Sequence, residues 1–340
     1  MSFDVRFANP IWATPGRWAA LVAFVCVAMA AGKPEAPTSI RKRGETVEFL
    51  AGESVVARLH AGASHAKPFL WPLIAPSGAA VTRGWPMEQP KAGGSVDHVH
   101  QKSAWFTFGD VIPDGVEFGF KKKGIAGIDF WAEMPLHGRI VCTKLEEPRD
   151  NRITMTLEWR GPNGQPVLSE QRTLLVHDFG AGRLLEVICE LHADRCPITF
   201  GDTKEGAFGV RVHDQLAHKS AAITNSRGAV GEKGCWGRLA DWCDYSGTID
   251  GQLAGVAILD DPANRCRACW HVREYGLMAA NPFGRAKSGF PDMAGRNDLV
   301  RLETGEQLRL RYGLYVHDGD ATSGKVAEAY RRFADIPKKH

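Results

Sequence analysis

The sequence lacks the motifs of several common enzyme classes. It contains no G-x-S-x-G elbow, no H-E-x-x-H, no Walker loop and no strand-linked G-x-G-x-x-G. The common routes to serine hydrolase, zincin, NTPase and dehydrogenase chemistry are therefore excluded. An excess of one charge is also lacking, because 42 Lys and Arg face 39 Asp and Glu, for a net charge of +3. This balance gives no indication of a nucleic-acid partner.

The residues that are present indicate a globular, turn-rich chain. Hydrophobic residues make up 44% and charged residues 24% of the 340 positions, and these proportions exclude wholesale disorder. A chain of this length buries enough surface to fold without a metal or disulfide staple. The 37 glycines and 19 prolines favour many tight turns and argue against helical bundles.

The N-terminal segment is predicted to be a secretory signal peptide over residues 1–31. Arg6 and Arg17 supply a positive region, and residues 18–31 form an uncharged apolar run that ends in small residues. This run of about 14 residues is short for a membrane span, which needs roughly 20. We therefore expect a periplasmic or secreted protein with no membrane partner after cleavage, and a retained anchor is the alternative.

Seven cysteines follow the predicted signal, and this odd number leaves at least one thiol free after full intramolecular pairing. They are Cys142, Cys189, Cys196, Cys235, Cys243, Cys266 and Cys269. Only Cys266 and Cys269 form a C-x-x-C pair, and no second pair with matching spacing accompanies it. The pattern favours structural thiols or a local disulfide over a metal site.

Short alternating segments separated by turns predict an all-β fold. Such patterns are typical of a sandwich or barrel. The expected strands include Val47 and Phe49 and residues 55–59, 152–159, 165–176, 183–191, 253–259 and 307–316. We expect residues 32–40 to be a linker and residues 41–340 to form a single large antiparallel β-sandwich domain.

One short helix is expected at the C-terminal end of this domain. Val326, Ala329, Tyr330 and Phe333 share a face before Pro337, and Ser323 is the expected cap.

Residues 97–110 carry the first candidate site segment. On an extended chain His98 and His100 point the same way, so they could bind a metal or transfer protons. Asp97 could orient one imidazole, Lys102 adds a positive donor, and Trp105 offers a flat surface for a sugar ring. A surface strand that happens to carry two histidines is the alternative.

Residues 270–284 carry the second candidate segment. His271, Arg273 and Tyr275 alternate, which places an imidazole, a guanidinium and a phenol on one strand face. Asn281 lies in an N-P-F-G turn that could place its amide at the rim of a pocket. Simple solvent exposure of this face is the alternative.

Residues 202–213 carry the third candidate segment. Glu205 precedes a glycine, and Arg211 follows on a short expected strand. A carboxylate near an arginine suits acid–base chemistry or carboxylate binding. A structural ion pair is the alternative.

Together these segments resemble the bacterial PmoA-like family, a group of exported proteins of unknown function often labelled methane oxygenase. The motifs that carry the resemblance are P-F-L-W-P-L-I-A-P-S-G (68–78), D-H-V-H-Q-K-S-A-W-F (97–106), H-G-R-I (137–140), D-T-K-E-G-A-F-G-V-R (202–211), W-H-V-R-E-Y-G-L (270–277) and A-A-N-P-F-G (279–284). The resemblance implies carbohydrate metabolism. It also implies a sandwich of the galactose-mutarotase type, whose sites use histidines and a carboxylate on the concave face.

The first motif departs from the family pattern, which is close to D-H-P-H-H-R-G-x-W. Asp97, His98, His100 and Trp105 match this pattern. Four positions differ. Val99 replaces the proline of the family, Gln101 the second of the adjacent histidines, Lys102 the arginine and Ser103 the glycine.

The leading hypothesis is an exported enzyme that acts on a sugar or glycoside by acid–base chemistry, as a hydrolase, lyase or epimerase. The candidates for proton transfer are His98, His100, His271 and Glu205. The candidates for substrate binding are Asp97, Lys102, Trp105, Arg211, Arg273, Tyr275 and Asn281. The alternatives are a non-catalytic carbohydrate-binding module and a metal enzyme that uses His98 and His100. The sequence identifies no cofactor.

Overall fold

A computed structural model describes residues 1–2, 34–119, 122–217 and 221–337. The predicted signal peptide, apart from its first two residues, lies outside this range. Contacts group the chain from Lys33 onward into one unit.

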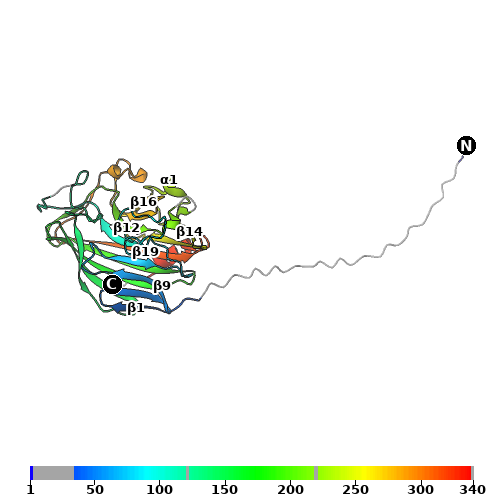
Figure 1. Cartoon of the computed structure of the whole chain (residues 1–340). Coiled ribbons are helices and arrows are strands. Elements are labelled where there is room, and N and C mark those ends of the chain that lie inside the picture. The colour runs from blue at the N-terminus through cyan, green and yellow to red at the C-terminus, as the bar shows by residue number, and fades with distance from the viewer. Residues whose placement is uncertain (3–33, 120–121, 218–220, 338–340) are drawn as a thin grey trace. The chain divides into compact units, whose positions relative to one another are not determined.

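Two large antiparallel sheets and one small sheet make up this unit (Figure 1). The first sheet has the order β1–β2–β3–β4–β5–β12–β17–β16. Its strands are β1 (Thr38–Arg43), β2 (Thr46–Ala51), β3 (Ser54–His60), β4 (Phe69–Leu73), β5 (Ala104–Phe108), β12 (Gly206–Arg211), β17 (Leu277–Asn281) and β16 (Cys269–Arg273).

The second sheet has the order β13–β14–β15–β19–β10–β9–β8–β7. Its strands are β13 (Ala222–Asn225), β14 (Trp242–Ile249), β15 (Gln252–Asp260), β19 (Gln307–Asp318), β10 (Gly182–His192), β9 (Pro166–Asp178), β8 (Arg152–Arg160) and β7 (Arg139–Leu145). The small sheet joins β18 (Val300–Leu302), β11 (Ile198–Phe200) and β6 (Val111–Pro113).

Helices are few and short among the described residues. They are α1 (Gly231–Cys235), α2 (Val326–Asp335) and the 3₁₀ turns η1 (Asp214–Leu216), η2 (Ala286–Ser288) and η3 (Pro291–Met293). None of the helices in this described part is long and apolar enough to cross a membrane.

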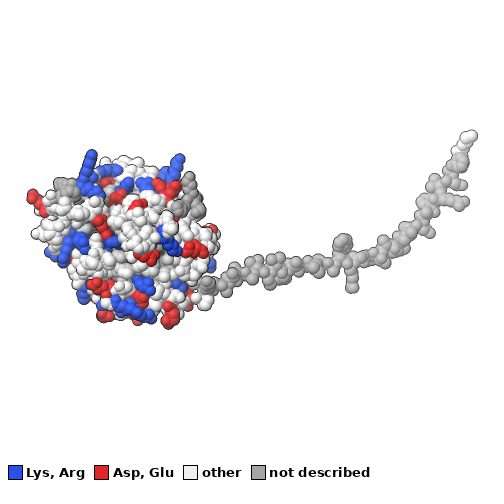
Figure 2. All heavy atoms as spheres, viewed as in Figure 1, with Lys and Arg blue, Asp and Glu red and all other residues white. Residues whose placement is uncertain are grey.

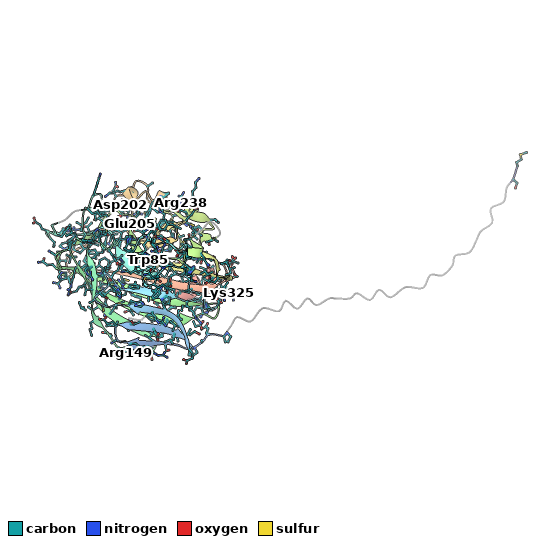
Figure 3. The ribbon with its side chains drawn as sticks, viewed as in Figure 1. Trp85, Arg149, Asp202, Glu205, Arg238 and Lys325 are labelled. Atoms are coloured by element: carbon teal, nitrogen blue, oxygen red, sulfur yellow. The ribbon has the colours of Figure 1, made fainter. Side chains whose placement is uncertain are left out.

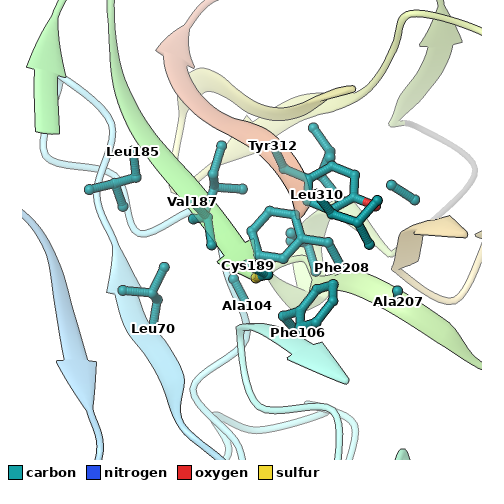
Figure 4. Close-up of a cluster of buried hydrophobic side chains, with 14 of the residues drawn as sticks. Leu70, Ala104, Phe106, Leu185, Val187, Cys189, Ala207, Phe208, Leu310 and Tyr312 are labelled. Carbon is teal, nitrogen blue, oxygen red and sulfur yellow. The ribbon is translucent and has the colours of Figure 1, made fainter. Parts of the chain in front are cut away.

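The core lies between the two large sheets, where aromatic rings from one sheet meet those of the other. Phe208 of β12 stacks on Tyr312 of β19 with ring centroids 5.4 Å apart, and Phe106 of β5 meets Trp159 of β8 at 6.2 Å. Figure 4 shows Phe106 and Phe208 beside Cys189 of β10 in this layer. Alternate residues of each strand point into this core. The opposite face of β5, β12 and β17 is covered as well, since every residue of these three strands is buried.

The predicted fold class is confirmed, since the chain is an antiparallel β-sandwich with a short C-terminal helix. Each of the seven expected strands is present within a residue or two. The predicted linker is shorter than expected, because β1 begins at Thr38 and pairs with β2.

The cap prediction for the C-terminal helix is wrong. Ser323 bonds to Asp320 in the preceding turn, and the helix begins at Val326 after Lys325. The apolar face itself is as expected, with Val326, Ala329 and Phe333 buried.

All seven cysteines of the described residues are free thiols in this structure. Burial raises the pKa of Cys266, and it raises the pKa of Cys269 to about 12. Both sulfurs of the C-x-x-C pair are therefore held as protonated, unreactive thiols.

Charges of both signs are interspersed over the face of the molecule in view in Figure 2. This mixture agrees with the near-neutral composition, and that face shows no extended patch of one sign.

Candidate functional site

The candidate segments meet on the outer face of the first sheet, opposite the core. Strand register aligns Trp105, Gly209, Ala279 and His271 in one row across β5, β12, β17 and β16. The small residues in the middle of the row leave room for the loops that cover the sheet. A Cβ atom on Gly209 would lie 3.1 Å from the ring of Trp131.

Asp97 is held in place by two buried arginines. Its Oδ1 accepts hydrogen bonds from Arg83 at 2.6 Å and from Arg211 at 2.9 Å. Burial alone would raise the pKa of Asp97. Hydrogen bonds from Ser95 and His98 and the charge of Arg211 outweigh burial and hold this pKa well below its usual range. Asp97 is therefore a fixed anion at pH 7.

His98 forms a dyad with this carboxylate. Its Nδ1 lies 2.7 Å from Asp97 Oδ2, and because a carboxylate only accepts, Nδ1 carries the proton. Nε2 is then the unprotonated nitrogen when the ring is neutral. The His98 ring stacks on Tyr275 at 5.2 Å with an interplanar angle of 3°, which fixes the direction in which Nε2 points.

The backbone around the dyad is turned rather than extended. His98 has a φ of +43° and Ser103 a φ of +52°, in a region that non-glycine residues rarely adopt. The expectation that His98 and His100 alternate along a strand is therefore wrong. Their rings are adjacent all the same, with centroids 5.6 Å apart. Strain of this kind is concentrated at functional sites.

His100 is held neutral. Burial lowers its pKa to about 3, and the positive charge of Lys67 acts in the same direction. Two lysines nearby are occupied by one carboxylate, because Glu133 bonds both Lys67, at 2.8 Å, and Lys102. Lys102 is therefore an ion-pair partner of Glu133 here and not a free donor to a substrate.

Glu205 is the carboxyl group suited to proton transfer. Burial raises its pKa, with the charge of Lys204 opposing and that of Asp129 adding to the rise. The side chain remains one-third exposed. Burial raises the pKa of Tyr275, and the charge of Glu205 adds to the rise, so this carboxyl lies within electrostatic reach of the ring that stacks on His98. Figure 3 labels Glu205 near the upper edge of the molecule.

Two buried side chains fix the backbone just before Glu205. His271 Nδ1 donates to the carbonyl oxygen of Lys204 at 2.7 Å, and Asn281 Nδ2 donates to that of Thr203 at 2.9 Å. Only 2% of His271 is exposed, and burial lowers its pKa to about 3. His271 is thus a positioning residue for Glu205, and its predicted role in proton transfer is not supported.

Arg273 and Tyr275 take different directions from the end of β16. Arg273 turns towards α1, where Nη1 bonds Glu232 at 2.7 Å and the guanidinium lies 3.8 Å from the Trp236 ring centre. Tyr275 lies in the turn that follows the strand, and its ring stacks on that of His98. Arg273 is therefore neutralised by an ion pair, whereas Tyr275 packs against the His98 ring of the dyad.

Three further residues predicted to bind substrate serve the fold in this structure. Trp105 is only 1% exposed, so its ring offers no open face to a sugar. Arg211 is buried with its guanidinium on Asp97 and Gln101. Asn281 uses its amide oxygen for the backbone of Phe283 and Gly284, so it does not stand at a pocket rim.

Sequence reasoning missed Arg83, Lys67, Asp129 and Glu133. Each reaches the site across a long stretch of chain, and none forms a short motif with the residues that it contacts. The only local signal is the placement of Asp129 and Glu133 in an otherwise apolar D-F-W-A-E segment.

Within the described ranges, no group of three or more His, Cys, Asp or Glu side chains could hold a metal ion. His98 instead bonds Asp97 through Nδ1, and His100 packs against it edge-on. The geometry therefore gives no support to the metal-enzyme alternative.

The role of His271 can be tested by substitution. We expect His271→Ala to lower kcat by about 10²-fold, because small misplacements of a catalytic group have effects of this size. His271→Asn should restore much of the loss, since its amide N–H can replace Nδ1–H. A direct proton-transfer role predicts no rescue by Asn. If Glu205 is the acid, one limb of the pH–rate profile follows its pKa. This limb should shift in His271→Ala and lie at the wild-type position in His271→Asn.

The neutral histidines also predict a pH dependence of stability. The pKa values of His100 and His271 fall from 6.5 to about 3 on folding. The unfolded chain therefore binds more protons between these pH values, and their contribution to stability is complete above 6.5 and is lost as pH falls towards 3. Urea unfolding at about pH 7 and about pH 4.5 measures the loss. The loss should be smaller in His271→Asn, and an equal loss in both proteins would contradict the prediction.

Solved structures similar to this chain include proteins of sugar metabolism. A GH36 α-galactosidase, AgaA from Geobacillus stearothermophilus in complex with raffinose, has 8% identity and a TM-score of 0.39, with 84% of this chain and 41% of that chain covered. This chain thus spans about two fifths of that enzyme's length.

Two shorter proteins are similar over nearly their whole length. A galactose mutarotase-like protein from Lactobacillus casei has 8% identity and a TM-score of 0.40, with 82% of this chain and 100% of that chain covered. A putative aldose 1-epimerase from Escherichia coli K12 has 11% identity and a TM-score of 0.34, with 83% and 99% covered.

No curated protein matches the sequence. A family model does match, over residues 46–331, which includes all three candidate segments. The chain therefore belongs to DUF6807, a family of unknown function.

Proposed function

We propose that this protein is an exported carbohydrate-processing enzyme that acts by acid–base chemistry at the Asp97–His98 dyad and Glu205. The observation that carries the proposal is the convergence of three distant segments on the outer face of the first sheet. They supply an oriented imidazole, a neutral second histidine and a carboxyl with a raised pKa. An acid and a base with such different protonation states are what proton transfer at a sugar requires.

The roles follow from the protonation states. Asp97 fixes the His98 tautomer, so Nε2 can take a proton from a hydroxyl, a water or a sugar carbon. Glu205, whose pKa is raised, retains its proton to higher pH than an ordinary carboxyl. It donates this proton to the sugar oxygen that leaves or that gains negative charge during the reaction. Hydrolase, lyase and epimerase reactions all use such a pair, and they differ in where the proton is taken.

Two other lines support the proposal. The resemblance to the PmoA-like family implies carbohydrate metabolism, and the apolar segment over residues 18–31 predicts export. The alternative of a simple binding module at this face requires an open aromatic platform, whereas Trp105 is buried.

A product screen tests the proposal. Purified protein is incubated with a library of glycans and oxidised glycosides, and products are identified by mass spectrometry, with NMR for isomers of equal mass. We expect a product from wild type that is absent with the His98→Asn variant. Equal product from both would show that the dyad is not catalytic. Native protein that begins at Met1 on N-terminal sequencing would contradict export.

A further inference from the structure

A separate cleft opens beside β4, and apart from His213 its lining residues lie outside the three candidate site segments. Its cavity volume is about 790 Å³, within the range of roughly 300–1,000 Å³ that is typical of small-molecule sites. Its walls come from distant parts of the chain, namely residues 58, 71–72, 77–80, 82, 84–85, 88–94, 213–215, 249–250 and 252. We call it the β4 cleft.

Indole and pyrrolidine rings give the β4 cleft its apolar surface. Trp71 and Pro72 belong to β4, whereas Trp85 and Pro90 come from the loop that precedes Asp97. Trp85 is labelled near the middle of the molecule in Figure 3. Flat rings of this kind present both an apolar face and a polar edge to a ligand.

Two polar atoms in the lining are buried and unsatisfied. Trp85 Nε1, a donor, and Asp214 Oδ1, an acceptor, have no hydrogen-bond partner among the described residues. A buried polar group left unpaired is destabilising, so a partner for it is favoured. A donor and an acceptor that both await a partner match hydroxyl groups, because a hydroxyl can serve as either.

The charges in the β4 cleft argue against an anionic ligand. Arg58 is paired with Glu48 at 2.9 Å, and Lys91 is paired with Asp250 at 3.2 Å. Burial lowers the pKa of His213 below its ordinary value, which keeps that ring neutral at pH 7. The described lining therefore offers no unpaired Lys or Arg to a phosphate or carboxylate, whereas Asp214 Oδ1 has no hydrogen-bond partner.

We propose that the β4 cleft is a second carbohydrate site, which binds a neutral oligosaccharide apart from the Asp97–His98 dyad. Sugar C–H faces pack on the indole rings, and hydroxyls bond Trp85 Nε1 and Asp214 Oδ1 after small side-chain rotations that turn these buried atoms towards the cleft. The class of ligand rests on the proposed function, whereas the position of the site rests on the cleft alone. The loop over residues 84–94 that forms one wall continues directly into Asp97, so the two sites share one segment.

Binding of defined oligosaccharides tests this proposal. The probes are neutral hexasaccharides of β-1,4-glucan, α-1,4-glucan, β-1,4-mannan and β-1,4-xylan, with an oligogalacturonate as the anionic comparison, each titrated by calorimetry. We expect at least one neutral probe to bind, and Trp85→Ala to weaken it by about tenfold. Trp85→Phe, which keeps an aromatic ring but lacks the N–H, and Asp214→Asn should weaken it less. Trp242→Ala, a partly buried tryptophan on β14 outside the cleft, should leave binding unchanged.

The outcomes separate this site from the dyad. Thermal unfolding first shows that each variant is folded. Binding lost in Trp85→Ala but kept in Glu205→Gln supports the cleft, even if no catalysed reaction is found. Binding lost in Glu205→Gln but kept in Trp85→Ala places the sugar at the dyad, which overturns the cleft proposal while supporting the proposed function. Binding of no neutral probe, or tighter binding of oligogalacturonate, also overturns it.

Discussion

Glu205→Gln should lower kcat by about 10²–10⁴-fold on the substrate that the product screen identifies, which is the usual contribution of a general acid or base. Gln has nearly the same shape but cannot donate a proton from a carboxyl. Because the pKa of Glu205 is raised, activity that depends on its protonated form should decline as pH rises through that pKa. This limb of the pH–rate profile should be absent in the variant.

The matched control is Glu53→Gln, since Glu53 is exposed in the turn between β2 and β3. It should leave both kcat and the pH profile unchanged. Thermal unfolding should be nearly the same in both variants, because the side chain of Glu205 makes no hydrogen bond among the described residues. If kcat survives in folded Glu205→Gln, Glu205 is not the acid.

Arg172→Leu should destabilise the fold by about 3–5 kcal/mol, the typical result of breaking a buried ion pair on one side. Arg172 of β9 bonds Glu170 through Nε at 2.6 Å and Nη2 at 2.9 Å, and both side chains are almost fully buried. Glu170 also accepts from the indole of Trp159 at 2.8 Å. Without the guanidinium, the Glu170 carboxylate is left uncompensated in the core.

Urea unfolding measures this loss as a shift in midpoint. The control is Arg160→Leu on the neighbouring strand, where the Arg160–Glu158 pair is partly exposed to solvent. Such pairs contribute about 0–1 kcal/mol. A loss in Arg172→Leu no larger than in the control would show that the buried pair does not stabilise the fold.

The dyad explains why arginines and an asparagine near the site are so thoroughly buried. Arg83 and Arg211 hold Asp97, and Asn281 and His271 hold the chain before Glu205. A proton-transfer group must be fixed in both position and direction to be effective. Under the proposed function, the polar residues of the three segments divide into two that transfer protons, His98 and Glu205, and a larger set that positions them.

The sequence predicted three segments that the fold brings to one face of the first sheet, but it did not predict which groups each side chain contacts. Local composition identified the segments that carry His98, Glu205 and Tyr275, because polar groups alternate with apolar ones there. It assigned His271 and Trp105 to direct roles, yet both are covered by other elements. Burial depends on residues far along the chain, so no local pattern reports it.

The sequence by itself determined the all-β class and the C-terminal helix, because the periods of two and 3.6 residues are local properties of the chain. Only the tertiary structure decided which histidine faces a carboxylate, which carboxyl has a raised pKa and which arginines are already paired. Those properties arise from desolvation and from charges brought together over long sequence distances, as when Arg211 reaches Asp97 across 114 residues. The β4 cleft, built from separate stretches between Arg58 and Gln252, is a product of the same assembly.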